Sequence, residues 1–378
     1  MSLDIIPPMR PWVPREDIEE MKRYLEQILV SGRLTLGEYT KQFELEFARL
    51  VDVKRAVAVN SGTSALEIAL RAQSLRRGDE VIVPTNTFAA TGAAVVYAGG
   101  KPVITDVTRD TMMIDSGIVK RAITKRTKGV VAVHIGGLVC PDIEGIRELC
   151  ADRDLFLIED AAHAHGSKIR GRLAGSLGIA GCFSFYPTKI ITSGEGGMIT
   201  TDNEDVATTA DILRDQGKES FNSNRVVRLG YNWRMPEMCA ALGLLQLRRL
   251  AEFIEKRNAV ARVYDTEFDK ASLERVVTPA DQLNNYYKYT LFLPEGMDRD
   301  RFKTLARERG VTYGGEVYWP PLHLQQPFYD FLAKGNRFRT ADEWGRRMVS
   351  PPMFSQMTKE QTDRVVDVTR DTLSKLRS

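Results

Sequence analysis

The sequence predicts an α/β fold built on a mostly parallel β-sheet that is sandwiched between helices. Three observations support this prediction. Short runs of apolar, often β-branched residues alternate with segments of helical spacing over residues 55–160. These runs are apolar almost throughout, which is typical of strands that are covered on both faces. The segments between them are long enough for crossover helices, which join parallel strands.

Two helices are expected before the first strand. Residues 15–30 have apolar positions at helical spacing, two glycines interrupt the pattern in residues 31–37, and a second helix follows at about 38–50. The alternating part then has predicted strands at 56–60, 80–84, 101–105, 129–134 and 155–160. The predicted helices of this part lie at 65–75, 88–100, 116–123 and 142–153.

The alternation changes near residue 180. Residues 182–187 and 196–202 are two successive predicted strands with a glycine-rich connection, which favours an antiparallel hairpin inserted in the sheet. A helix is expected at 203–215. A single long helix is expected to begin near Pro236 and to continue to about residue 268.

We expect two domains from the chain length. Residues 1–250 form a large domain that includes the N-terminal helical arm, and residues 251–378 form a smaller α+β domain. The smaller domain has a predicted strand at 286–294, a helix after Asp298, and strands near 311–315 and 349–353. It ends in a helix at 359–375.

Composition excludes several classes of protein. The 53 basic and 50 acidic residues give a formal charge of +3, which gives no electrostatic case for nucleic acid or an anionic membrane as the main partner. No apolar run approaches the ~18 residues of a membrane span, and the N-terminus lacks the apolar core of a signal peptide. The four cysteines form no CxxC pair. A soluble, cytoplasmic protein is expected.

Polar residues follow the first strand of the predicted sheet in the sequence Asn60-Ser61-Gly62-Thr63-Ser64. Gly62 permits a tight turn into the next helix, whose first N–H groups and the Thr63 and Ser64 hydroxyls could bind a phosphate. An ordinary helix cap explains the same residues equally well.

A second strand delivers Glu159 and Asp160 at its end, and a buried carboxylate needs a partner. A protonated ring nitrogen is one possible partner. His163 and His165 follow, and could be core histidines with satisfied hydrogen bonds. A metal site is disfavoured, because the chain has only four histidines and no clear third ligand is near.

Lys189 follows the third informative strand, after an aromatic–proline turn that is flanked by Ser184 and Thr188. Burial lowers the pKa of a lysine and makes its amine available as a nucleophile that forms a Schiff base. A surface lysine on a hairpin is the alternative. Phe88, in the loop after another strand, could stack on a flat ring or belong to the core.

A phosphate cradle, an aspartate for a pyridine nitrogen and a nucleophilic lysine are the parts that pyridoxal phosphate requires. The motifs VNSGTSALEIAL, GDEVIVPTNTFAATGAAV, FLIEDAAHAHGS, FSFYPTK and GYNWRM occur in this order and strongly resemble the DegT-type aminotransferase family, which includes nucleotide-sugar aminotransferases. The resemblance extends from about Pro14 to the C-terminus. It implies the aspartate-aminotransferase (type I) fold and a homodimer with active sites shared at the subunit interface.

The resemblance also implies roles for individual residues. Lys189 and Asp160 match the catalytic positions, with Lys189 as the Schiff-base lysine and Asp160 bound to the pyridine nitrogen, which an adjacent anion keeps protonated. The positions expected to bind the cofactor through its ring or phosphate are Phe88, His163, Gly62, Thr63, Ser64 and Ser184. Asn232 of GYNWRM is expected to reach the phosphate of the neighbouring subunit. No metal is expected.

The reaction implied by the resemblance has two halves with ping-pong kinetics. An amino-acid donor, usually L-glutamate, displaces Lys189 from pyridoxal phosphate, Lys189 then moves a proton, and pyridoxamine phosphate is the form left behind. A keto-sugar, preferably nucleotide-linked, then accepts the amine. Alternatives are a cyclitol or other ketone as acceptor, a lyase, a desulfurase that uses Cys140, or a non-catalytic sensor. Ile190 and Gly136 depart from residues common in the family, which puts the acceptor class in doubt.

Overall fold

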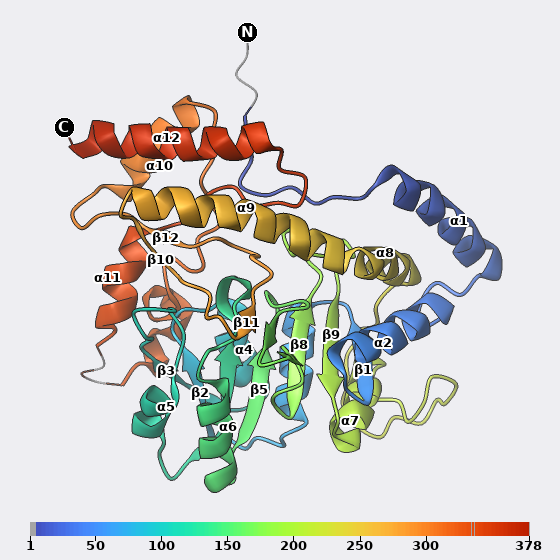
Figure 1. Cartoon of the computed structure of the whole chain (residues 1–378). Coiled ribbons are helices and arrows are strands. Elements are labelled where there is room, and N and C mark those ends of the chain that lie inside the picture. Colours follow the sequence, from blue (N-terminus) through green and yellow to red (C-terminus); the bar gives the residue numbers. More distant parts are fainter. Residues whose placement is uncertain (1–4, 334, 336, 378) are drawn as a thin grey trace.

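The computed structural model describes residues 5–333, 335 and 337–377 of the chain. The described part is built around a seven-stranded sheet of order β1-β9-β8-β5-β4-β2-β3 (Figure 1). Strand β9 is antiparallel to both of its neighbours, and the other pairings in this sheet are parallel. Six strands therefore point in one direction. The predicted mostly parallel sheet, with an inserted antiparallel hairpin, is confirmed.

The elements follow the predicted order closely in the large sheet and its helices. The strands of this sheet are β1 (Arg55–Val59), β2 (Glu80–Pro84), β3 (Lys101–Thr105), β4 (Thr127–Val133), β5 (Phe156–Asp160), β8 (Ala180–Ser184) and β9 (Gly197–Thr201). The helices up to the hairpin and directly after it are α1 (Arg15–Ser31), α2 (Glu38–Val51), α3 (Gly62–Arg71), α4 (Ala89–Tyr97), α5 (Ser116–Ala122), α6 (Ile143–Asp152) and α7 (Glu204–Arg214).

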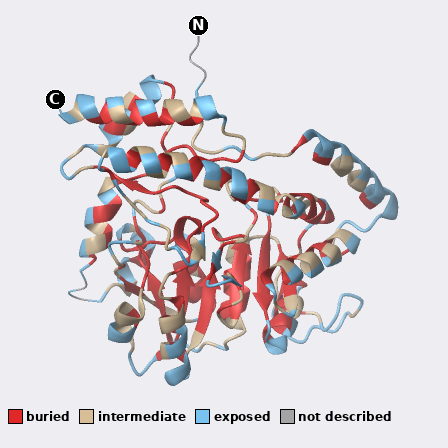
Figure 2. Ribbon diagram, in the orientation of Figure 1, coloured by how far each residue is buried: buried red, intermediate tan, exposed pale blue. Residues whose placement is uncertain are grey.

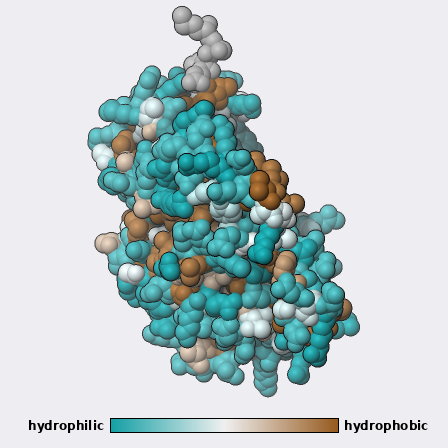
Figure 3. Space-filling view, turned by 90° about the vertical axis from the view of Figure 1, so that its right-hand side faces the viewer, coloured by the Kyte–Doolittle hydropathy of each residue, from teal (hydrophilic) through white to brown (hydrophobic). Residues whose placement is uncertain are grey.

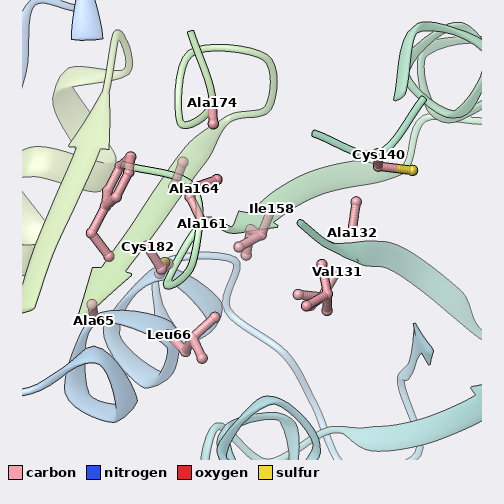
Figure 4. Close-up of a cluster of buried hydrophobic side chains, with 14 of the residues drawn as sticks. Ala65, Leu66, Val131, Ala132, Cys140, Ile158, Ala161, Ala164, Ala174 and Cys182 are labelled. Carbon is pink, nitrogen blue, oxygen red and sulfur yellow. The ribbon is translucent and has the colours of Figure 1, made fainter. Parts of the chain in front are cut away.

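The sheet is buried on both faces, as its apolar strands require. Every residue of β2 and β9 is buried, and helices pack over the strands (Figure 2). Figure 4 shows part of this core, where Ala65 and Leu66 of α3 lie near Val131 of β4, Ile158 of β5 and Cys182 of β8. This packing fixes the carboxyl ends of the strands relative to one another.

The prediction of a single long helix from Pro236 is wrong. The segment forms two helices, α8 (Glu237–Arg248) and α9 (Leu250–Lys270), which meet at Arg249. The sequence has no glycine or proline at this point. Arg249 donates hydrogen bonds to Asp17 and Glu16 of α1. This contact joins residues more than 230 positions apart, so the helical periodicity gives no sign of it.

The C-terminal part contains less strand than expected. A second sheet has the order β10 (Glu274–Arg275), β12 (Leu291–Phe292) and β13 (Met348–Val349). The strand predicted at 286–294 is only β12. The Tyr287 N–H donates to the Asn285 side chain, and the Lys288 N–H donates to Gly136 O, so neither N–H pairs with a strand. Near 311–315 only an isolated bridge between Ile6 and Val311 forms. The strand expected at 349–353 ends early as β13, because Pro351 and Pro352, which follow Ser350, lack N–H donors.

A third small sheet was not predicted. It contains β11 (Gln282–Leu283), β6 (Lys168–Ile169) and β7 (Arg172–Leu173). The predicted helix after Asp298 is α10 (Arg299–Glu308), and the C-terminal one is α12 (Lys359–Arg377). Helix α11 (Arg339–Arg347) was also missed. The N–H groups of Thr340 and Ala341 in its first turn donate to the carboxylate of Asp106, which lies more than 230 positions earlier in the chain.

Two clusters of buried hydrophobic residues occur in the described part. The first surrounds the large sheet, and the second includes Ile6 together with residues between Val260 and Leu373. Phe253, Tyr287 and Trp344 nevertheless belong to the first cluster. The division into domains at residue 250 therefore stays a prediction. Across the described residues, we find no helix with the length and apolar character that a bilayer crossing needs.

Candidate active site

A cavity of about 480 Å³ opens at the carboxyl ends of β1, β2, β5 and β8. Because these strands are parallel, the residues that follow them meet at one edge of the sheet. The cavity is lined by seven of the predicted residues: Gly62, Thr63, Phe88, Asp160, His163, Ser184 and Lys189. The three sequence segments singled out as chemically informative therefore form one site.

The junction of β1 and α3 forms one wall of the cavity. Ser61 is the N-cap of α3, and its Oγ accepts a hydrogen bond from the Ser64 N–H at 3.1 Å. The N–H groups of Gly62 and Thr63 precede the first intrahelical bonds and have no partner within the helix. Ser184 of β8 lies against this turn. A Cβ on Gly62 would be 2.7 Å from the Ser184 Cβ, so only glycine allows this approach.

Ser64 differs from the expectation. Its side chain is buried and does not line the cavity. The Ser64 hydroxyl donates to Asn60 Oδ1 at 2.7 Å and lies 2.9 Å from Ser61 Oγ. These bonds stabilise the start of α3, so for Ser64 the helix-cap interpretation describes the geometry, whereas Gly62 and Thr63 face the cavity.

Asp160 ends β5 and is buried beneath the cavity. Its Oδ2 accepts a hydrogen bond from the Thr91 hydroxyl at 2.6 Å, and its Oδ1 accepts one from the Ala162 N–H at 3.2 Å. Burial raises the pKa of Asp160, and the Thr91 hydrogen bond opposes that effect. A cation placed against this carboxylate would remove the cost of its burial.

The neighbouring carboxylate, Glu159, has a different role. It accepts hydrogen bonds from the N–H groups of Gly175, Leu177 and Gly178, and lies 2.9 Å from His134 Nε2. These contacts hold the loop before β8 against the end of β5. Glu159 therefore stabilises the fold and does not line the cavity.

Lys189 lies in the loop between β8 and β9. Its backbone N–H donates to Tyr186 O, and the Thr192 hydroxyl and the Ser193 N–H donate to Phe185 O, which closes the loop around the lysine. The Nζ is 4.8 Å from the centre of the Tyr287 ring, and among the described residues it has no hydrogen-bond or ion-pair partner. Desolvation lowers the pKa of Lys189 to about 8, Asp160 opposes this shift, and Lys288 adds to it.

Aromatic side chains form the rest of the wall. Phe88 precedes α4 and is 60% exposed, which is unusual for a core phenylalanine but suited to stacking on a bound ring. His163 is buried, and its ring centre lies 4.2 Å from that of Tyr287. Burial, with Lys189 and Lys288 nearby, holds the pKa of His163 well below its ordinary value, so the ring is neutral.

His163 and His165 do not point to a common site. His165 lies between Phe183 and Phe185, with ring centres 5.3 and 5.4 Å away. Burial lowers the pKa of His165 to about 3. Within the described residues, no group of three or more His, Cys, Asp or Glu side chains could hold a metal ion.

Asn232 is not in this cavity. It is exposed and lines a neighbouring hollow together with Arg234 and Cys239. Ser61 and Glu195 line both hollows. Within one chain, the structure thus separates Asn232 from the other predicted cofactor residues.

Sequence reasoning missed four side chains at the site: Thr91, Tyr186, Tyr287 and Tyr318. Thr91 lies three residues after Phe88, so it could have been found as the residue one helical turn further on. Tyr287 and Tyr318 come from the C-terminal part of the chain and carry no local signal. The two departures noted in the sequence lie outside the cavity: Ile190 is buried in the core, and Gly136 adopts a φ of +66° in a short turn.

The residues fit pyridoxal phosphate by their chemistry. Helix N–H groups and the Thr63 hydroxyl suit a phosphate, the buried Asp160 carboxylate suits a protonated ring nitrogen, and Phe88 suits an aromatic face. The unpaired amine of Lys189 suits an aldehyde carbon. Each group lies on the cavity wall or directly beneath it.

Comparison with known proteins also indicates an aminotransferase. The sequence profile of the DegT/DnrJ/EryC1/StrS aminotransferase family matches residues 15–370. The spore coat polysaccharide biosynthesis protein SpsC of Bacillus subtilis is 36% identical, over 97% of this chain and 96% of that protein. The GDP-perosamine synthase of Caulobacter vibrioides is 35% identical, over 93% and 95%.

Solved structures share the fold. The crystal structure of DesV from S. venezuelae, in complex with a ketimine intermediate, superimposes with a TM-score of 0.91 at 31% identity. The match covers 98% of each chain. The predicted type I fold is confirmed by this agreement and by the mostly parallel sheet.

Proposed function

We propose, on the premise that this chain belongs to the DegT/DnrJ/EryC1/StrS aminotransferase family, that it transfers an amino group from L-glutamate to a nucleotide-linked keto-sugar. The observation that carries the proposal is the cavity in which the unpaired Lys189 amine, the buried Asp160 carboxylate and the start of α3 occur together. Relatives named as GDP-perosamine synthase and as a dTDP-amino-sugar transaminase support the class of acceptor.

The cofactor would be held at three points. Gly62, Thr63 and Ser184 would bind its phosphate, Asp160 would pair with its ring nitrogen, and the Lys189 amine would bond to its aldehyde carbon. When bound, pyridoxal phosphate withdraws electrons from the carbon that bears the amino group. Thr91 and the Ala162 N–H orient the Asp160 carboxylate through their hydrogen bonds.

Lys189 is the residue that moves protons. Its lowered pKa of about 8 leaves about a tenth of the amine neutral at pH 7, so Nζ can accept a proton and return it to a neighbouring atom. Asp160 would serve as a fixed anion and not as a second base, because a protonated ring nitrogen beside it would keep its carboxylate ionised. The donor and the acceptor use this single cavity in turn, so we expect ping-pong kinetics.

A homodimer with shared sites belongs to the same proposal. Figure 3 shows the face toward α1 and α2, which is mainly hydrophilic with hydrophobic groups gathered near its middle. Exposed apolar side chains on α1 and in the loops after α1 and α7 include Val30, Leu34 and Leu229. A second copy that covers them would bring its Asn232 toward the phosphate of this chain.

The desulfurase alternative lacks support at its key residue. Cys140 is fully buried, does not line the cavity, and donates from its Sγ to Ile114 O at 3.2 Å. Burial raises the pKa of the Cys140 thiol to about 12, so little thiolate forms.

The test uses purified enzyme with pyridoxal phosphate, L-glutamate and a panel of UDP-, dTDP- and GDP-linked keto-sugars. Mass spectrometry of the products should show an amine in place of the keto oxygen for one nucleotide class, together with 2-oxoglutarate. The same sugars without the nucleotide are the control. Transfer only to a free cyclitol ketone, or to no carbonyl compound, would contradict the proposed acceptor.

A further inference from the structure

Tyr318 reaches the cavity from the C-terminal part of the chain and is fixed there by its backbone. Its N–H donates to the side-chain oxygen of the buried Asn86, whose amide donates to Met112 O. Four residues further on, the Leu322 N–H donates to Thr85 O at 2.7 Å. These bonds dock the segment on the residues that follow β2, next to Phe88, whose ring centre is 5.9 Å from that of Tyr318.

The hydroxyl of Tyr318 lies 2.9 Å from Nε2 of His163. The direction of this hydrogen bond follows from the other ring nitrogen. The Gly136 N–H donates to Nδ1 of His163 at 3.4 Å, so Nδ1 is an acceptor and carries no proton. A neutral imidazole then has its single proton on Nε2. His163 therefore donates to the Tyr318 oxygen.

The proton of the Tyr318 hydroxyl consequently points to another acceptor. Among the described residues, His163 is the only hydrogen-bond partner of the Tyr318 oxygen, so none of them accepts this proton. Burial raises the pKa of Tyr318 well above its ordinary value, so the group stays a phenol and keeps its proton. Because Tyr318 lines the cavity, its hydroxyl proton is available to an acceptor atom of a ligand bound there.

We propose that Tyr318 donates its hydroxyl proton to an oxygen atom of the ligand bound in this cavity, and that His163 fixes this direction. The sequence of donors runs from the Gly136 N–H to His163, from His163 to Tyr318, and from Tyr318 to the ligand. The proposal rests on the proposed function, since the ligand is then the cofactor or the amino-acid substrate. Tyr318 would favour ligands that place an oxygen atom within hydrogen-bond distance of its hydroxyl.

The first experiment examines the enzyme without cofactor. The chain has four histidines, so nitrogen NMR of protein labelled in its histidine rings can resolve His163. We expect a neutral His163 with its proton on Nε2, and in Tyr318→Phe we expect that proton to exchange with water about tenfold faster. A proton on Nδ1 would overturn the proposal, because Tyr318 would then donate to His163 and have no proton for a ligand.

The second experiment separates the two sources of the oxygen. Pyridoxal phosphate is titrated into wild-type, Tyr318→Phe and Tyr329→Phe protein, and the KM for L-glutamate is then measured. Tyr329 is an exposed tyrosine of the same segment whose hydroxyl donates to Leu324 O, outside the cavity, so its variant should match the wild type.

One lost hydrogen bond should weaken binding about three- to tenfold. A weaker affinity of Tyr318→Phe for pyridoxal phosphate assigns the oxygen to the cofactor. An unchanged affinity with a raised KM for L-glutamate assigns it to the substrate. No change in either quantity overturns the proposal. If the wild type binds pyridoxal phosphate but does not react with L-glutamate, the proposed function fails, while the NMR result and the titration still decide the role of Tyr318.

Discussion

At the scale of single residues, the behaviour of Lys189 depends on its surroundings. An ordinary lysine is protonated near neutral pH and cannot act as a nucleophile. Here desolvation lowers the pKa to about 8, and the positive charge of Lys288 contributes to the shift. Asp160 opposes it, because its negative charge stabilises the ammonium form. The surroundings of Lys189 thus favour the neutral amine by desolvation and the ammonium form by the charge of Asp160.

This balance predicts the titration of Lys189 in the enzyme without cofactor. Only the neutral amine reacts with an acylating reagent, so labelling of Lys189 should rise as the pH passes about 8. In Asp160→Asn the pKa should fall further, because a charge that favours the ammonium is removed. Competitive labelling followed by peptide mass spectrometry measures both.

Lys359 is the internal control for this experiment. It is exposed, and its hydrogen bond to Asp363 raises its pKa above the ordinary value. If the labelling of Lys189 rose over the same pH range as that of Lys359, the protein would not activate Lys189.

The site residues on the N-terminal side could be predicted because each follows a strand with a recognisable pattern. Asp160 is the last residue of such a strand, and Gly62 and Lys189 lie shortly beyond two others. The residues missed belong to the opposite wall. Tyr287 and Tyr318 reach the cavity through contacts with loops more than 100 positions away, such as that between Asn285 and His163 O. Local spacing contains no information on these contacts.

At the scale of elements, the proposed phosphate site depends on the turn from β1 into α3. Ser61 caps the helix, and Gly62 allows Ser184 of β8 to approach the first turn. Any side chain at position 62 would meet both the Cβ of Ser184 at 2.7 Å and the backbone of β8. Because that strand is fixed in the sheet, the helix start would have to move.

We therefore expect Gly62→Ala to weaken pyridoxal phosphate binding by about tenfold or more while the chain remains folded, since one or more of the phosphate contacts would be lost. Gly117→Ala is the matched control. Gly117 also lies in the first turn of a helix, and its added Cβ would meet only side-chain atoms, those of Asp115 at 3.3 Å and Arg121 at 3.5 Å. Equal affinities of the two variants, measured by titration of the protein without cofactor, would contradict this account of the cradle.

The elements show where sequence patterns suffice and where they fail. The strands β1 to β5 and helices α1 to α7 were predicted, because their hydrophobic periodicity reflects a sheet covered on both faces. The division between α8 and α9, the length of β12 and the existence of α11 were not. Each of these depends on a distant residue: Asp17 at Arg249, Gly136 at Lys288, and Asp106 at the start of α11.

At the scale of the whole molecule, two neutral histidines are buried beside the site. His163 and His165 both have a pKa below the ordinary value, mainly through burial. In the unfolded chain they would bind protons below about pH 6.5. The folded state binds these protons only at lower pH, near 3 for His165. The unfolded state thus holds more protons in this window, and stability falls as the pH falls.

This linkage predicts an acid-sensitive fold. Below about pH 6.5 each such histidine should reduce the free energy of unfolding by about 1.4 kcal/mol per pH unit. His165→Leu removes one titrating group. The difference in unfolding free energy between this variant and the wild type should therefore change by about 1.4 kcal/mol for each pH unit between pH 6 and 4. Denaturant titrations at several pH values measure it, and a difference that is independent of pH would contradict the assignment.

The most direct test of the central claim is the visible absorption spectrum of the wild type and of Lys189→Ala with pyridoxal phosphate, before and after L-glutamate is added. The account predicts a visible band of the bound cofactor in the wild type, its loss when L-glutamate is added, and no such covalent band in the variant. A band that L-glutamate leaves unchanged would contradict the donor half-reaction. The same band in Lys189→Ala would contradict the assignment of Lys189.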